Sequence, residues 1–302
     1  MLADPCNRGA TLLRSPSGVR HQSPTVRARR LALELTNCRN TTGLTREEVA
    51  SRLEWSTSTI FRIETGRSLP QPRSMRELLD LYGIVGSERE RLIQLAREAR
   101  QPGWWRSYRD VLPNPYEVYI GLETGAASIY NFESVAIPGL LQTPEYARAM
   151  IKGGAQELSH DEIERFTEVR LTRQLILSRQ DRPRLWVVID EAAVHRVIGS
   201  PAIMRGQLHH LLAATEAGKT TMQVIPFTAG AHAGTSGSFV ILEFSDLADP
   251  HVVYVETLAG DLYLEERSDI TDYTIAFERL RATALSPGDS IDLLKNAADN
   301  MA

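Results

Sequence analysis

The stretch that decides the fold of the N-terminal region runs from residue 44 to residue 66. It reads Leu44-Thr-Arg-Glu-Glu-Val-Ala-Ser-Arg-Leu-Glu-Trp-Ser-Thr-Ser-Thr-Ile-Phe-Arg-Ile-Glu-Thr-Gly66. Thr45, with Glu48 three residues later, has the pattern of a capping box, which begins a helix. The Ser56 hydroxyl is suited to cap the next helix, which Gly66 ends. The stretch therefore predicts two short helices joined by a tight turn.

Apolar residues within this stretch recur at helical spacing and supply a shared core. The small side chain of Ala50 lies where the second helix must cross the first closely. A scaffold helix of this kind holds the following helix at the surface, as a helix-turn-helix requires. The residues expected in this core are Val49, Ala50, Leu53, Ile60 and Ile63.

The outer face of the second helix carries candidate contact residues. We expect Thr57, Ser58, Phe61 and Arg62 to be exposed there. Short hydroxyls and a guanidinium suit a groove lined by phosphates and base edges. Glu64, by contrast, is expected to form an ion pair that fixes the fold, with a nearby arginine such as Arg52.

Sequence patterns typical of helices continue on both sides of this stretch, over residues 24–102. A first helix is expected from about Val26 to the glycine at position 43. A fourth helix closes at Gly83, and Ser87 is expected to cap a fifth. Residues 1–23 have no apolar period and are predicted to be a disordered tail. Pro102-Gly103 marks the expected domain boundary.

The quoted stretch resembles the Cro/cI-like, or xenobiotic-response-element, family of helix-turn-helix regulators. The matching text is Leu-Thr-x-Glu-Glu-Val-Ala-x-Arg-Leu, followed by Trp-Ser-x-Ser-x-Ile-x-Arg-Ile-Glu-x-Gly. The resemblance covers about residues 25–85 and implies a five-helix DNA-binding domain whose third helix enters the major groove. Members usually have glutamine at the position of Arg46 and glycine at that of Glu54. A left-handed Glu54 would cost about 1 kcal/mol, so a slightly altered turn is expected.

The resemblance also implies roles for individual residues. Carried over by position, Thr45 and Arg46 contact backbone phosphate, and the outer face of the third helix meets bases and phosphates. Arg67 is either a phosphate contact or a solvated side chain. The full set of predicted DNA-binding residues is Thr45, Arg46, Ser56, Thr57, Ser58, Thr59, Phe61, Arg62 and Arg67.

Beyond residue 103 the pattern changes to mixed helices and strands. We predict an α+β protein, in which an N-terminal all-α five-helix helix-turn-helix domain precedes a mixed α/β domain with a mostly C-terminal sheet. The second domain is expected over residues 103–286, with a tail or short helix over 287–302. Strands are expected at 131–137, 184–189, 221–226, 238–244, 251–257 and 261–264, and helices at 143–151, 161–179, 203–214 and 271–284.

Composition and charge exclude some classes of protein and favour others. The chain has 302 residues, 42 % of them hydrophobic and 24 % charged, which excludes a disordered or fibrous protein. No run of about 18 apolar residues or signal peptide is present, so a cytoplasmic, nucleoid-associated protein is expected. Residues 1–103 have a net charge of +6 (17 basic, 11 acidic) and residues 104–302 a net charge of -10 (17 basic, 27 acidic). The first third therefore suits a polyanion.

The C-terminal two-thirds resembles the uncharacterised domain fused to helix-turn-helix modules in actinobacterial regulators of the WhiJ type. That resemblance implies a transcriptional regulator, often encoded beside a small partner protein in an antitoxin-like arrangement. The sequence motifs on which this resemblance rests include Gly103-Trp-Trp105, Ile137-Pro-Gly-Leu-Leu-Gln-Thr143, Leu185-Trp-Val-Val-Ile-Asp-Glu-Ala192, Gly230-Ala-His-Ala-Gly234 and Gly260-Asp-Leu-Tyr-Leu264.

Several side chains of this region allow two interpretations. His232 is either a ligand contact or a turn histidine bonded to backbone. Asp190 and Glu191 are either acid–base groups or caps of a helix. Trp104-Trp105 either line an aromatic pocket or dock a linker. The candidate ligand or partner residues are Trp104, Trp105, Tyr119, Glu123, Glu191 and His232.

Three hypotheses follow. The favoured one is a DNA-binding transcriptional regulator that acts on a double-stranded operator as a homodimer. Its acidic C-terminal domain would sense a small basic partner protein or a small molecule. The alternatives are an antitoxin-like interaction protein and an enzyme that carries a DNA-targeting domain. We assign no catalytic residue, metal ligand or cofactor, because the sequence contains no matching motif.

Overall fold

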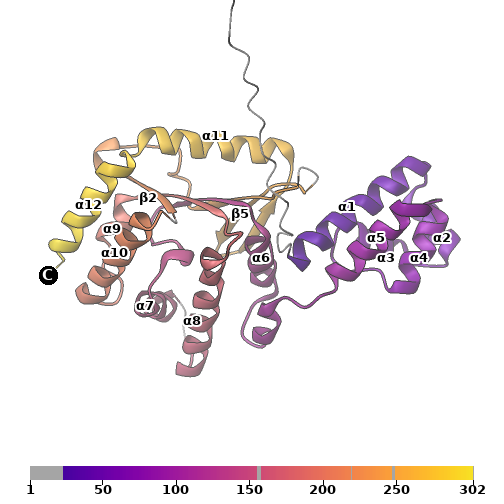
Figure 1. Cartoon of the computed structure of the whole chain (residues 1–302), viewed down its shortest axis with the longest axis horizontal. Helices are drawn as coiled ribbons and strands as arrows, with labels where there is room; N and C mark the ends of the chain where they lie inside the picture. The colour runs from indigo at the N-terminus through magenta and orange to yellow at the C-terminus, as the bar shows by residue number, and fades with distance from the viewer. Residues whose placement is uncertain (1–22, 155–157, 219, 247–248, 302) are drawn as a thin grey trace, which may run out of the picture.

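The computed structural model describes residues 23–154, 158–218, 220–246 and 249–301. Figure 1 shows a smaller helical lobe beside a larger lobe built around a sheet. The predicted disordered tail falls almost entirely outside the described residues.

Helices α1–α5 form the smaller lobe: α1 (Pro24–Thr42), α2 (Arg46–Leu53), α3 (Thr57–Glu64), α4 (Pro72–Leu81) and α5 (Gly86–Ala99). The Ser23 hydroxyl caps α1, which has proline at its first position and ends at the left-handed Gly43. The prediction that Ser87 caps α5 is wrong, because α5 already begins at Gly86, its N-cap position is Val85, and no side chain caps it.

The core of this lobe contains the apolar residues that helical spacing predicts. Val49 and Ala50 of α2 and Ile60 and Ile63 of α3 are buried, whereas Leu53 is partly buried against the same cluster. Three other helices complete the cluster through Leu31, Leu35, Met75, Leu78, Leu79, Tyr82, Leu92 and Ala96.

The larger lobe contains a sheet whose strands, in the described part of the chain, lie in the order β3-β2-β1-β4-β5-β6. Strands β1, β2 and β3 are parallel, whereas β4, β5 and β6 continue the sheet antiparallel from β1. The strands are β1 (Ser128–Glu133), β2 (Arg184–Asp190), β3 (Thr220–Ile225), β4 (Phe239–Glu243), β5 (Val252–Thr257) and β6 (Gly260–Leu264).

Helices cover both faces of this sheet, so the larger lobe has three layers (Figure 1). Helix α11 packs on one face through Phe277 and Leu280. The opposite face carries a larger apolar core and most of the remaining helices. The helices of the lobe are α6 (Asn114–Gly125), α7 (Pro144–Gly154), α8 (His160–Gln174), α9 (Glu191–His195), α10 (Pro201–Glu216), α11 (Arg267–Thr283) and α12 (Pro287–Asp299).

Three features of the larger lobe differ from expectation. The first strand occupies 128–133 and not 131–137, because Ser128 pairs with Arg184 in the sheet register. Helix α6 is absent from the sequence prediction. Helix α12, beyond the expected end of the domain at 286, buries Leu294 and Ala298 in the main core.

Candidate nucleic-acid interface

Both α2 and α3 are capped at their N-terminal ends. The Thr45 hydroxyl accepts a hydrogen bond from the Glu48 amide, and the Glu48 carboxylate accepts one from the Thr45 amide at 2.8 Å. This bond lowers the pKa of Glu48. The Ser56 hydroxyl accepts from the Thr59 amide at 3.2 Å. These caps fix where each helix begins, as the sequence predicts.

Glu54 ends α2 in a left-handed conformation, with φ +56° and ψ +36°. It is the one non-glycine residue with positive φ in the described part of the chain. The turn therefore keeps the backbone that glycine would adopt, and the expected alteration does not occur. A side chain in this region costs about 1 kcal/mol, which the surrounding caps and core offset.

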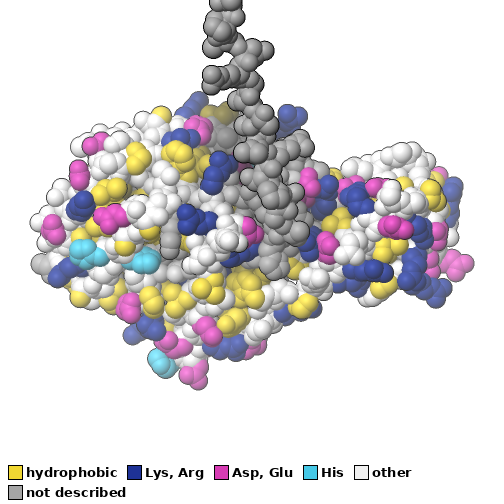
Figure 2. All heavy atoms as spheres, in the orientation of Figure 1, with side chains coloured by type: hydrophobic (Ala, Val, Ile, Leu, Met, Phe, Trp, Pro, Cys, Tyr) yellow, Lys and Arg dark blue, Asp and Glu magenta, His cyan; other side chains and the backbone are white. Residues whose placement is uncertain are grey.

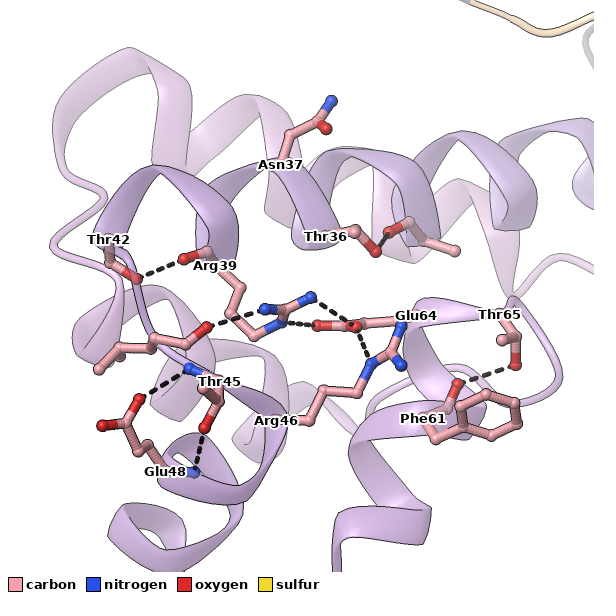
Figure 3. A network of polar contacts seen from close by, with 12 residues as sticks. Thr36, Asn37, Arg39, Thr42, Thr45, Arg46, Glu48, Phe61, Glu64 and Thr65 are labelled. Carbon is pink, nitrogen blue, oxygen red and sulfur yellow. Dashed lines mark hydrogen bonds and ion pairs between the residues drawn. The ribbon is translucent and has the colours of Figure 1, made fainter. Parts of the chain in front are cut away.

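Glu64 of α3 forms the polar centre of the small lobe (Figure 3). Its side chain is only 2 % exposed, and its two carboxylate oxygens accept from Arg39 of α1 at 2.5 and 3.2 Å. Arg46 donates to the same carboxylate at 2.6 Å. The predicted ion pair therefore exists, but its partners are Arg39 and Arg46 and not Arg52. This pairing ties α3 to both α1 and α2.

The outer face of α3 is exposed at the predicted positions. Thr57, Ser58, Phe61 and Arg62 are all exposed. Phe61 is close to two cations, with the guanidinium carbons of Arg46 and Arg67 at 5.4 and 5.6 Å from its ring centre. Figure 2 shows further cationic side chains on this lobe, all of them arginines because residues 23–102 contain no lysine. The face thus combines hydroxyls, an aromatic ring and positive charge, which suits phosphates and base edges.

Some of the predicted contact residues also have structural roles within the small lobe. Ser56 and Thr59 bond to each other at 2.9 Å and serve the α3 cap. Thr45 serves the α2 cap, although it remains exposed. Arg46 is 38 % exposed and ion-paired to Glu64, so it is a fixed rather than a freely moving cation.

Two of the candidate ligand residues lie in the interior of the larger lobe. Tyr119 and Glu123 of α6 are 6 % and 1 % exposed. Glu123 makes a two-pronged ion pair with Arg173 of α8, at 2.7 and 2.8 Å. Burial alone would lower the pKa of Arg173, but the Glu123 carboxylate raises it well above its usual value. These side chains hold α6 to α8, which corrects the expectation that they face a ligand.

His232 and Asp190 meet at the carboxyl edge of the parallel strands. The His232 Nε2 lies 3.0 Å from an Asp190 oxygen, and its Nδ1 accepts from the Gly234 amide at 3.1 Å. The other Asp190 oxygen caps α9 by accepting from the Ala192 amide. Both predicted structural roles, the turn histidine and the helix cap, are therefore present. Both ring nitrogens are engaged inside the protein, which leaves none for a substrate.

The remaining carboxylates at this edge are also engaged. Glu191 accepts from the Phe227 amide at 2.6 Å and lies 3.2 Å from His195. Glu133, at the end of β1, accepts from Asn131 at 3.2 Å. Burial raises the pKa of Glu133 to about 7. No local sequence pattern indicates this shift, because it depends on the layers that cover β1.

Trp104 and Trp105 lie in the short helical turn that follows the small lobe. Trp105 is buried with Leu112, Ile120 and Val169. Trp104 is partly buried and meets the Trp105 ring edge-on, at 6.0 Å between centres. The two indoles therefore dock the connecting segment onto the larger lobe, and Trp104 also lines a surface hollow.

Neither a metal cluster nor a membrane span is found within the described residues. No group of three or more His, Cys, Asp or Glu side chains there could hold a metal ion. No helix of the described chain is both long and apolar enough to cross a membrane.

Comparison with known proteins gives two family matches, one in each lobe of the chain. Residues 30–92 match a family described as a helix-turn-helix domain. Residues 116–296, well over half of the chain, match a family described as a domain of unknown function, DUF5753. The curated proteins and the solved structures gave no match. A helix-turn-helix domain indicates a DNA-binding regulator, and the chain belongs to the DUF5753 family, with that helix-turn-helix domain at its N-terminal end.

Proposed function

We propose that the protein is a sequence-specific transcriptional regulator of the Cro/cI-like type, in which residues 24–102 bind DNA. The observation that carries this proposal is the exposed face of α3. Thr57, Ser58 and Arg62 are presented there by a helix that the buried Glu64 fixes to its neighbours. A rigid helix of this kind can enter the major groove with its side chains already placed.

A homodimer on a pseudo-symmetric operator in the cytoplasm completes this proposal. A single small module buries too little surface for strong specificity, so two copies would bind half-sites about one helical turn apart. The net charge of +6 in residues 1–103 supports attraction to DNA. The net charge of -10 in residues 104–302 argues against a second nucleic-acid contact by the larger lobe.

The larger lobe would sense a small molecule or a small basic partner protein and shift the equilibrium toward or away from the DNA-competent state. An enzymatic role is less well supported, because the best acid–base candidates are bonded within the protein. The ring nitrogens of His232 and the oxygens of Asp190 and Glu191 all have partners in their own lobe.

The test is retention of genomic DNA fragments by the purified protein near physiological salt. The wild type is compared with a Thr57→Ala, Ser58→Ala, Arg62→Ala triple variant. The matched control carries Thr271→Ala, Thr274→Ala and Arg279→Ala, which remove the same number of hydroxyls and charges from exposed positions of α11.

A few fragments held by the wild type and the control, and lost by the triple variant, would establish a site-specific regulator. Equal, salt-sensitive retention by all three proteins would mean binding driven by charge alone and would contradict the proposal. The function would then lie in the larger lobe. Co-purification of a small neighbouring protein would favour the antitoxin-like alternative.

A further inference from the structure

A hollow of about 430 Å³ lies where the two lobes meet. Small-molecule sites commonly have volumes of about 300–1,000 Å³. Four parts of the chain supply its walls: the start of α1, the connecting segment 101–105, the end of α6, and residues 172–179 at the end of α8 and the turn that follows it. Its lining includes Ser23, Pro24, Trp104, Trp105, Leu175 and Arg179.

The walls of this hollow are mainly apolar and aromatic. Leu175 is 62 % exposed, which is unusual for a large apolar side chain, and Trp104 is only partly buried. The Trp105 ring is fixed by the core behind it. A Cβ on Gly103 would lie 2.3 Å from that ring, so only glycine lets the connecting segment pass so closely. The aromatic wall is therefore preformed.

The polar groups of the hollow carry no unbalanced charge. Arg179 pairs with Asp181, with nitrogen–oxygen distances of 3.2 and 3.3 Å, and donates to the Thr124 carbonyl. The Ser23 hydroxyl accepts from the Thr25 amide as the cap of α1. An anionic ligand would have to compete with Asp181 for the guanidinium. A flat, uncharged ligand could stack on the indoles without that cost.

The position of the hollow connects it to the DNA-binding lobe through α1. The first turns of α1 belong to the larger lobe, where Val26 joins the main core. Leu31 and Leu35, further along the same helix, belong to the core of the small lobe. One continuous helix therefore spans both cores, and its capped N-terminus forms part of the wall.

Close packing fixes α1 to the larger lobe beside the hollow. A Cβ on Gly121 of α6 would lie 1.9 Å from the Thr25 hydroxyl, and one on Gly125 would lie 2.8 Å from Val26. Arg30 adds ion pairs to Asp246 and Asp249 at 3.0 and 3.3 Å. Later turns of the same helix lie in the core of the small lobe, so a ligand that shifts the start of α1 against these contacts would also move the small lobe.

We propose that this hollow binds a small, uncharged aromatic molecule, and that its occupancy changes the affinity of the small lobe for DNA. The coupling to DNA rests on the proposed regulatory function, whereas binding in the hollow does not.

The binding step is tested by titrating the full chain with N-phenyl-1-naphthylamine, a neutral aromatic probe, and following its fluorescence. The expected result is saturable binding of one probe per chain, with energy transfer from tryptophan. Leu175→Arg places a long charged side chain at the rim and should weaken binding at least tenfold. Because Leu175 is largely exposed, this variant should fold, which its thermal unfolding would confirm.

Two matched variants and a second probe make the titration specific. Ala213→Arg alters a neighbouring hollow between α8 and α10 that also touches Leu175, and Leu258→Arg alters a remote exposed leucine. Both should bind the probe like the wild type. The anionic analogue 8-anilino-1-naphthalenesulfonate should bind at least tenfold more weakly than the neutral probe.

The following results would overturn the site or the ligand class. Wild-type affinity in Leu175→Arg would place the probe elsewhere, and lost affinity in Ala213→Arg would place it in the neighbouring hollow. Equal or tighter binding of the sulfonate would refute the preference for uncharged ligands. Absence of saturable binding would refute the site itself.

The coupling step is tested with a DNA fragment that the wild type retains. Saturating neutral probe should change the dissociation constant of that fragment at least about fivefold, the lower end of usual allosteric couplings, and Leu175→Arg should abolish the change. Unchanged DNA affinity with bound probe would refute the coupling. A protein that retains no DNA would refute the proposed function, whereas the probe titration would still decide the site.

Discussion

Arg39 of α1 and Glu64 of α3, 25 residues apart in the chain, form a two-pronged ion pair in the interior of the small lobe. Their side chains are 11 % and 2 % exposed. Arg39 also donates to the Leu44 carbonyl at 2.8 Å, just before α2 begins. The pair therefore connects three helices and sets the position of the helix that presents the proposed contact face.

Glu64→Gln should lower the free energy of unfolding of the small lobe by about 3 kcal/mol, because it leaves the Arg39 charge buried without a counter-ion. Chemical denaturation measures this change. Glu77→Gln, which breaks an exposed pair with Arg73, is the matched control and should cost less than about 1 kcal/mol. Similar losses in both variants would contradict the central role of Glu64.

Arg46→Gln should leave stability nearly unchanged, since Glu64 keeps Arg39 as its partner. If Arg46 contacts phosphate, the slope of the logarithm of DNA affinity against the logarithm of salt concentration should decrease by about 0.9, the value for one released contact. A salt titration of DNA binding measures this slope. An unchanged slope would mean that Arg46 acts only within the fold.

Glu54→Gly should raise the free energy of unfolding by up to about 1 kcal/mol, since glycine adopts the left-handed conformation without steric cost. The gain is partly offset by the greater freedom of glycine in the unfolded chain. Glu54→Val, with a β-branched side chain, should be destabilised at the same position. Thermal unfolding of the two variants should therefore move in opposite directions, and a shift in the same direction would refute the strain argument.

Glu133→Gln should become more stable relative to wild type as pH rises from about 4.5 to about 7. The folded protein raises the pKa of Glu133 from 4.5 to about 7, so folding favours the protonated acid. In the wild type, the protonated Glu133 carboxyl stabilises the folded state fully below pH 4.5. This stabilisation is lost as pH rises through 7, and the free energy of unfolding falls by at most about 1.4 kcal/mol per pH unit. Denaturation at several pH values measures the difference, and a constant difference would contradict the shifted pKa.

Gly121→Ala should destabilise the contact between α1 and α6 by about 1–3 kcal/mol, because the added methyl collides with Thr25. Gly206→Ala is the matched control, as its Cβ would meet nothing within 4 Å on the exposed side of α10. That variant should gain about 0.5–1 kcal/mol. Equal effects of the two substitutions on unfolding would mean that α1 is not held closely by α6.

The helices of the small lobe were predictable because their signals are local. Thr45 and Ser56 cap the starts of α2 and α3, the left-handed Gly43 ends α1, and the left-handed Gly66 follows the end of α3 within two residues. Helix α6 escaped prediction because Gly121 and Gly125 have low helix propensity. Those glycines are explained only by the approach of α1, which is nearly one hundred residues away in the chain.

The candidate site residues also differ in whether the local sequence could predict their positions. The exposure of Thr57, Ser58 and Arg62 follows from helical spacing, so the sequence sufficed to predict it. The interior position of Tyr119 and Glu123 depends on Arg173, a residue fifty positions later, and no local pattern indicates that partner.

The sequence by itself determined the caps, the turn, the alternation of apolar residues and the division of charge between the two parts of the chain. These properties depend on neighbouring residues, and their physical causes act over one or two helical turns. The tertiary structure alone decided that Glu64 meets Arg39, that α12 closes the core, and that α1 is shared by two lobes. Such pairings depend on how complete helices and sheets fit together, because a buried charge or a close helix crossing is stabilised only by partners distant in the chain.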